Sequence, residues 1–208
     1  MKSLYIVLIF LFLLTGLVAF RVSYAFFSNS GTSSANTFTA ASCFSSGTHI
    51  VINEESSDGQ AKGEWVELFN PTCGSIDVSG WKISDKNASD NGQDDTFPAV
   101  SPIPAGGYSV VITNNTSVVG IPPTAITIEL TSANIGNGLN DDGDAVHLKN
   151  PSNVVVDEMS YGNNHDVFNP APSAPPANQS LARSPNGVDT NTAADWVVDT
   201  TPSIGVAN

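Results

Sequence analysis

After residue 25 the apolar stretches of this chain are short, and clusters of Gly, Pro, Asn, Asp and Ser separate them. No window there shows sustained helical periodicity, so the pattern predicts several short strands in a β-sandwich or barrel. Turns are expected at Asn70-Pro71, at Asp142-Gly143 and in the Lys149–Asn153 hairpin. The strands are expected near His49–Glu54, Glu64–Asn70, Trp81–Ser84, Tyr108–Thr113, Thr124–Leu130, Ala145–Lys149 and Val154–Ser160, with a weaker one at Ser180–Arg183.

The N-terminus contains an uncharged apolar run from Leu4 to Phe20. A membrane-spanning helix needs about 20 such residues and a signal-peptide core about 7–15, so the run falls between the two classes. Lys2 supplies the positive start, and small residues precede a cleavage site after Ala25. Arg21 on the outer flank favours retention instead. We therefore expect an exported protein, secreted after removal of residues 1–25 or anchored by a hydrophobic helix at residues 4–20.

Charge and cysteine content fit an exported protein. The chain has 7 Lys and Arg against 20 Asp and Glu, a net charge of −13. Such a charge repels phosphate backbones, which argues against nucleic acid as a direct partner. The sequence holds two cysteines, Cys43 and Cys73. An even, low count in an oxidising compartment predicts one disulfide between them, and two free thiols are the alternative.

Several segments, taken in order, resemble the lamin tail domain, the Ig-like module of nuclear lamins that also occurs in exported bacterial proteins. The resemblance covers Ile50–Tyr161 and implies an all-β, Ig-like β-sandwich preceded by the N-terminal hydrophobic helix. The closing Ser180–Arg183 is similar to bacterial members. The segments that carry the resemblance are Ile52-Asn53-Glu54, Glu64–Pro71, Asp77–Ile83, Pro104–Val111 and Asp142–Leu148.

This interpretation divides the chain into five parts. Residues 1–25 are the signal peptide or anchor, and residues 26–47 are a Ser/Thr-rich linker. The segment that begins this linker is similar to the start of camelysin-type precursors. Residues 48–162 are the lamin tail domain, residues 163–178 are an exposed Pro-rich loop, and residues 179–208 are a C-terminal segment that packs on the domain.

Carboxylates on the two early strands are the first candidates for chemistry. Glu54, Glu55, Glu64 and Glu67 could approach one another like the paired acids of a glycosidase. These positions belong, however, to the ordinary pattern of the resembled family, where they look structural. No Gly-x-Ser-x-Gly, His-Glu-x-x-His or phosphate-loop motif occurs in the sequence. We expect no catalytic residues and no enzyme.

Metal binding is the second candidate chemistry. Asp141, Asp142 and Asp144 lie within five residues of one another, and Asp90, Asp94 and Asp95 form another acidic loop. Calcium takes six to eight oxygen ligands, which such loops can supply. The spacing does not fit an EF-hand, so we expect a β-turn at Asp141–Asp144, with a calcium site as the alternative. His49, His147 and His165 lack ligand partners at zinc spacing, and no other cofactor is expected.

The function that these observations favour is a non-catalytic binding module, exported or at the cell surface. The expected partner is an extracellular protein or polysaccharide, with membrane contact through the N-terminal segment if it is not cleaved. Two alternatives remain open. One is a self-assembling matrix or envelope subunit, and the other is an accessory domain to a separately encoded exported hydrolase.

Overall fold

The structure is a computed structural model that describes residues 47–57, 63–85, 94–100, 102–115 and 118–208. The predicted N-terminal helix, its cleavage site and the linker up to residue 46 lie outside the described residues. Within the described residues, no helix combines the length and hydrophobicity needed to cross a membrane.

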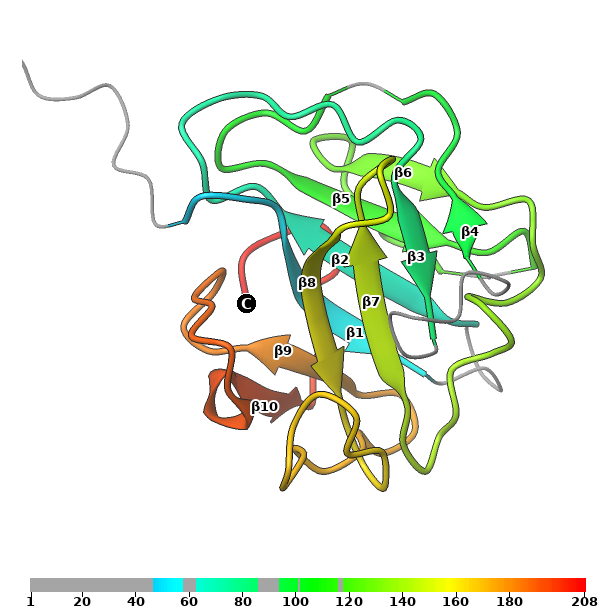
Figure 1. Ribbon diagram of the computed structural model, residues 1–208, viewed down its shortest axis with the longest axis vertical. Helices are drawn as coiled ribbons and strands as arrows, with labels where there is room; N and C mark the ends of the chain where they lie inside the picture. The colour runs from blue at the N-terminus through cyan, green and yellow to red at the C-terminus, as the bar shows by residue number, and fades with distance from the viewer. Residues whose placement is uncertain (1–46, 58–62, 86–93, 101, 116–117) are drawn as a thin grey trace, which may run out of the picture. The chain divides into compact units, whose positions relative to one another are not determined.

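Two β-sheets form the domain (Figure 1). The larger sheet has the order β10-β9-β1-β2-β5-β6, and its pairs are antiparallel except for the parallel β5–β6 pair. Its strands are β1 (Val51–Ser56), β2 (Trp65–Phe69), β5 (Tyr108–Ile112), β6 (Ile126–Glu129), β9 (Ser180–Arg183) and β10 (Trp196–Asp199), and the short 3-10 helix η2 (Ala193–Asp195) precedes β10.

The smaller sheet has the order β4-β3-β7-β8 and is antiparallel throughout. Its strands are β4 (Asp95–Thr96), β3 (Lys82–Ser84), β7 (Ala145–Lys149) and β8 (Val155–Ser160). The Lys149–Asn153 turn joins β7 to β8 as the predicted hairpin, and Asn153 takes a positive φ of 63° there. Asn tolerates this left-handed conformation better than most residues.

The hydrophobic core lies between the two sheets. Alternate residues of β2, such as Val66 and Leu68, face alternate residues of β7, such as Val146 and Leu148, and all four are fully buried. This arrangement is the period-2 pattern of a sandwich, in which each strand contributes every second side chain to the core. The predicted all-β, Ig-like β-sandwich is confirmed.

The strands expected from the sequence are all present, with boundaries that agree to within two residues. Two strands were not expected as strands. β4 is only 2 residues long, and β10 is a four-residue edge strand. Both are too short for periodicity to separate them from a loop.

Neither Trp65 nor Trp81 fills the centre of the sandwich. Trp65 is buried but lies opposite Ser56, on the face of β2 that points away from the core, and Trp81 packs only at the margin of the core. The large aromatic side chains of the core come from later segments instead: Phe97, Tyr161, Phe168 and Trp196. Side-chain size alone does not show which face of a strand a residue occupies.

Candidate functional site

Glu54 and Glu67 are directly opposite each other on β1 and β2. Glu67 lies between the core residues Val66 and Leu68, so it points to the outer face of the larger sheet. There the C-terminal tail covers both carboxylates. The Ser203 backbone N–H donates to Glu54 Oε1 (3.2 Å) and its hydroxyl to Oε2 (3.1 Å), and the Ser180 hydroxyl also bonds Oε1.

Glu67 is held in the same way. Asn53 Nδ2 donates to its Oε1 (2.7 Å), and the Gly205 backbone N–H donates to its Oε2 (2.5 Å). Burial raises the pKa of Glu67 to about 8 against the opposing effect of these hydrogen bonds. The structure thus brings Glu54 and Glu67 together, and both bind the protein's own tail.

Glu64 holds the loop over residues 135–139. Its carboxylate accepts hydrogen bonds from the backbone N–H groups of Ile135 (2.7 Å) and Leu139 (3.0 Å). Asp85 and Asp95 bind the same loop, through the N–H groups of residues 137 and 136 at 2.7 and 2.6 Å. Burial raises the pKa of Glu64 to about 7. Three carboxylates therefore replace the strand partners that the loop over residues 135–139 lacks.

Glu55 points into the sandwich, because it pairs with the core residues Val66 and Leu181. It is fully buried, and neither carboxylate oxygen has a hydrogen-bond partner within the described part of the chain. Burial and the nearby Glu54 and Asp144 carboxylates raise its pKa well above the usual range. A raised pKa favours the protonated, neutral form of Glu55, which avoids the large cost of an isolated buried charge.

A glycosidase acid must touch its substrate. Glu54, Glu55 and Glu67 are fully buried and Glu64 is 7% exposed, and three of the four accept hydrogen bonds from the chain itself. The arrangement supports the structural interpretation of these positions.

The acidic turn Asn140–Asp144 is closed by its own hydrogen bonds. Asp144 accepts from the N–H groups of Ala145 (2.8 Å) and Asn140 (3.1 Å), and the Asn140 side chain accepts from the N–H of Asp142 (3.1 Å). Burial raises the pKa of Asp144 to about 6. Asp141 and Asp142 are exposed. In the described ranges, no group of three or more His, Cys, Asp or Glu side chains is arranged to hold a metal ion.

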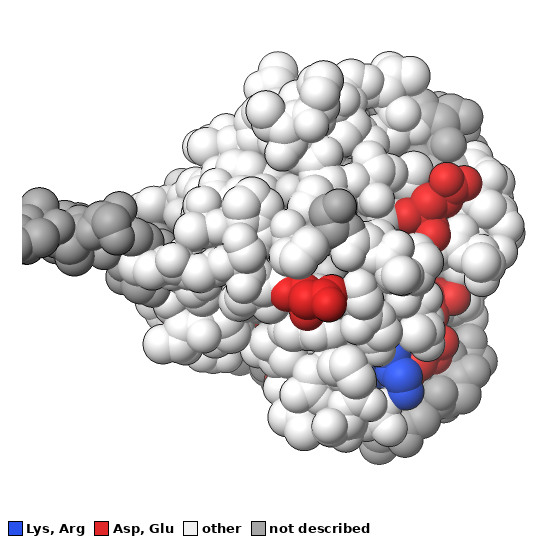
Figure 2. Space-filling model, turned by 90° about the horizontal axis from the view of Figure 1, so that it is seen from above, with Lys and Arg blue, Asp and Glu red and all other residues white. Residues whose placement is uncertain are grey.

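The second acidic loop is used for ion pairs. Asp94 lies 2.7 Å from Lys149 Nζ and 3.8 Å from Lys82 Nζ, and Lys149 is fully buried. Asp90 lies outside the described residues. On the face shown in Figure 2, acidic patches stand among uncharged residues and basic surface is scarce.

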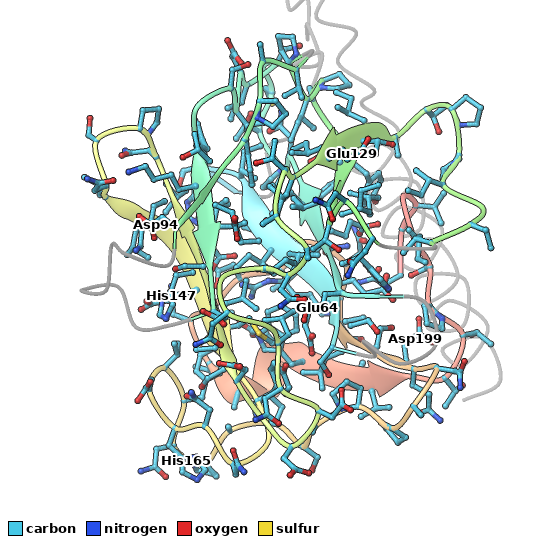
Figure 3. All side chains as sticks on the ribbon, turned by 90° about the vertical axis from the view of Figure 1, so that its right-hand side faces the viewer. Glu64, Asp94, Glu129, His147, His165 and Asp199 are labelled. Atoms are coloured by element: carbon cyan, nitrogen blue, oxygen red, sulfur yellow. The ribbon has the colours of Figure 1, made fainter. Side chains whose placement is uncertain are left out.

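The three histidines lie apart. His49 is 3.5 Å from Asp189, and His147 Nδ1 is 3.0 Å from Glu158 Oε2. His147 lies on β7, whereas His165 lies at the far end of the loop after β8 (Figure 3). Burial lowers the pKa of His147 despite the Glu158 carboxylate.

A small pocket lies beside the acidic turn. Its volume is about 70 Å³, and the Pro-rich segment supplies half of its lining. The lining residues are Ser57, Asp141, Pro175, Pro176, Ala177 and Gln179.

The predicted disulfide involves one described residue. Cys73 lies in the exposed turn after β2, and its sulfur is disulfide-bonded. Cys43 lies outside the described residues. The Cys43–Cys73 pairing therefore stays a prediction.

The sequence interpretation missed the role of Arg183. This residue is 1% exposed, and its guanidinium joins the two sheets to the loop before β10. A signal was present, because a lone arginine in a strand-like segment must find acceptors if that strand is buried. Its contacts are Ile52 O (2.6 Å), both Asp157 oxygens (3.1 and 3.0 Å), Val188 O (3.2 Å), Asp189 (3.1 Å), Asp195 (3.3 Å) and the Trp196 ring at 4.6 Å from the centroid.

The fold and these contacts define an Ig-like β-sandwich whose buried charged groups hold its own tail and loops. The family model described as Lamin Tail Domain matches residues 44–163. The chain belongs to the lamin tail domain family, a family of non-catalytic Ig-like domains, and it carries a β-sandwich interaction module. A search of curated proteins finds no match.

Proposed function

We propose that this chain is a non-catalytic binding module that acts outside the cell on a protein or polysaccharide partner. Residues 4–20 would export it and, where uncleaved, hold it at the membrane. The proposal extends the family assignment, which supports an interaction module, to this chain's location and type of partner.

The observation that carries the proposal is that the buried carboxylates of β1 and β2 bind groups of the same chain. Glu54, Glu64 and Glu67 accept hydrogen bonds from backbone amides or side chains of the same chain and are closed off from solvent. Groups used in this way stabilise the fold and leave recognition to exposed loops and strand edges. In β-sandwiches, binding residues are often placed in such loops.

The test is a binding survey with the full chain in detergent micelles, against purified extracellular polysaccharides and proteins immobilised on a sensor. We expect saturable binding to at least one surface, by a monomer as judged from sedimentation velocity. Filaments or large oligomers without heterologous binding would overturn the proposal in favour of the matrix subunit.

A further inference from the structure

Strand β10 forms one edge of the larger sheet. It pairs with β9 on one side, and within the described residues no strand pairs with its other side. Figure 1 shows β10 at the rim of the domain, beyond β9. An edge strand presents unpaired backbone groups, which can accept a further strand.

The hydrogen-bond pattern shows which backbone groups face outward. The Ser184 N–H donates to Asp195 O at 2.7 Å, so residues 184 and 195 form a hydrogen-bonded pair. Along an antiparallel ladder, hydrogen-bonded pairs alternate with pairs that are not hydrogen-bonded. The next hydrogen-bonded pairs are therefore 182–197 and 180–199, and the pair 181–198 is not hydrogen-bonded. The backbone N–H and C=O of Val198 therefore point away from β9, to the open edge.

The side chains of this edge are apolar and exposed. Val197 is 47% exposed and Val198 is 39% exposed. Natural edge strands are protected by short length, charged side chains, a proline or a bulge. β10 is short and ends on the charged Asp199, but it contains no lysine, proline or bulge within Trp196–Asp199. The edge can therefore pair with another strand.

We propose that β10 binds an extended peptide segment of a partner protein as an additional antiparallel strand. The proposal rests on the binding function above and names the class of partner. The segment would place apolar side chains against Val197 and Val198, and a lysine or arginine near Asp199. This mode combines main-chain hydrogen bonds for affinity with side-chain contacts for specificity.

The negative charge of the chain favours a basic peptide segment, and not a second copy of the chain, as the strand that pairs with β10. Antiparallel pairing of two β10 strands about Val198 would bring the two Asp199 side chains to diagonal positions on one face, where like charges repel. Each copy also carries a net charge of −13. A cationic segment instead gains from the same charges, which steer it to the edge.

The probe is the synthetic peptide Lys-Thr-Val-Thr-Val-Thr-Lys with blocked ends, and the comparison peptide carries Glu in place of both Lys residues. Amide hydrogen exchange is measured by NMR on the full chain in detergent micelles. Without peptide, we expect the Val198 amide to exchange fast and the Val197 amide to exchange slowly. Addition of the Lys peptide should slow the Val198 amide, and the Glu peptide should bind more weakly.

Val198→Pro removes the outward N–H and leaves the bonds to β9 in place, since proline is tolerated where its missing N–H would face solvent. We expect this variant to bind the Lys peptide at least about tenfold more weakly, the loss of one to two hydrogen bonds. The matched control is Val119→Ser, which removes another exposed valine and should bind like the wild type. Circular dichroism verifies that both variants fold.

Three results would overturn the proposal. One is unchanged affinity of Val198→Pro, and another is a Val198 amide that is already protected without peptide. The third is dimerisation in sedimentation that protects this amide, which would make the occupant a second copy. The binding survey separates the two proposals. If the chain binds a surface in that survey and Val198→Pro binds it equally well, the β10 proposal is wrong and the proposed function stands.

Discussion

Arg183 on β9 and Asp157 on β8 form a two-pronged ion pair between the two sheets, with Nη2 at 3.1 and 3.0 Å from the two carboxylate oxygens. Asp157 also accepts the Ile52 backbone N–H at 2.7 Å, which ties β1 to the same point. Burial nevertheless raises the pKa of Asp157 to about 6, because desolvation outweighs the Arg183 charge. The pair fixes how the C-terminal strands sit on the sandwich.

Breaking this pair should destabilise the domain strongly. Arg183→Met leaves Asp157 buried without its charged partner, and we expect a loss of about 3–5 kcal/mol in the free energy of unfolding. The double variant Arg183→Met/Asp157→Leu removes both charges and should recover part of the loss. Urea denaturation followed by tryptophan fluorescence measures both. Arg183→Met with wild-type stability would show that the pair does not anchor the sheets.

Stability should fall as the pH rises from 6.5 to 8.5. Unfolded glutamates ionise near pH 4.5, whereas the folded pKa values of Glu64 and Glu67 are about 7 and 8. The folded state therefore binds more protons across this range, so their stabilisation is complete below the unfolded pKa and is lost as the pH passes the folded pKa. The raised pKa of Glu55 also makes the stability fall as the pH rises. We expect the melting temperature to drop by on the order of 5–10 °C.

The pKa shift of His147 changes the stability with pH in the opposite direction. Its folded pKa is lowered, so its stabilisation is present above pH 6.5 and is lost as the pH falls further. The domain should therefore be most stable in mild acid. Glu67→Gln is the control, because it should flatten the slope between pH 7 and 8.5. A melting temperature that climbs over the range from 6.5 to 8.5 would contradict this assignment of signs.

Millimolar calcium should not change the melting temperature. The Asp144 oxygens already accept two backbone N–H groups, and a calcium ion would have to compete for them. A specific ion would stabilise the folded state by mass action. Differential scanning fluorimetry with calcium, magnesium and chelator measures the effect. A rise of several degrees that disappears in Asp142→Asn/Asp144→Asn would establish the calcium site.

Native-source protein should contain one Cys43–Cys73 disulfide. Closing a loop of about 30 residues would stabilise the fold by roughly 3–4 kcal/mol through chain entropy. Alkylation under denaturation, followed by peptide mass mapping, should show no free thiol and one cross-linked peptide pair. Two alkylated cysteines per chain would refute the pairing.

The strands and the family could be predicted from the sequence because they depend on local patterns. Val66 and Leu68 alternate with Glu67, and Gly80 and Gly106 stand where the chain takes positive φ values of 75° and 68°. Period-2 alternation and glycine in tight turns are readable over a few residues.

The partners of the buried charges could not be predicted in this way. Glu54 meets Ser203 across 149 residues, and Arg183 meets Asp157 from the other sheet. Such pairs depend on how the strands are ordered in space, which hydrophobic periodicity does not encode. The sequence therefore predicted a structural role for these glutamates without showing which groups they bind.

Whether the domain binds its partner without cleaving it is tested by chemical analysis of extracellular polymers from the chain's own host after incubation with the full chain. The wild type and the variant Glu54→Gln/Glu64→Gln/Glu67→Gln are compared, with retention measured by sedimentation of the polymer and cleavage by mass spectrometry. We predict that the wild type is retained and that every polymer stays intact. New reducing ends or released peptides with the wild type, absent with a folded variant, would contradict it.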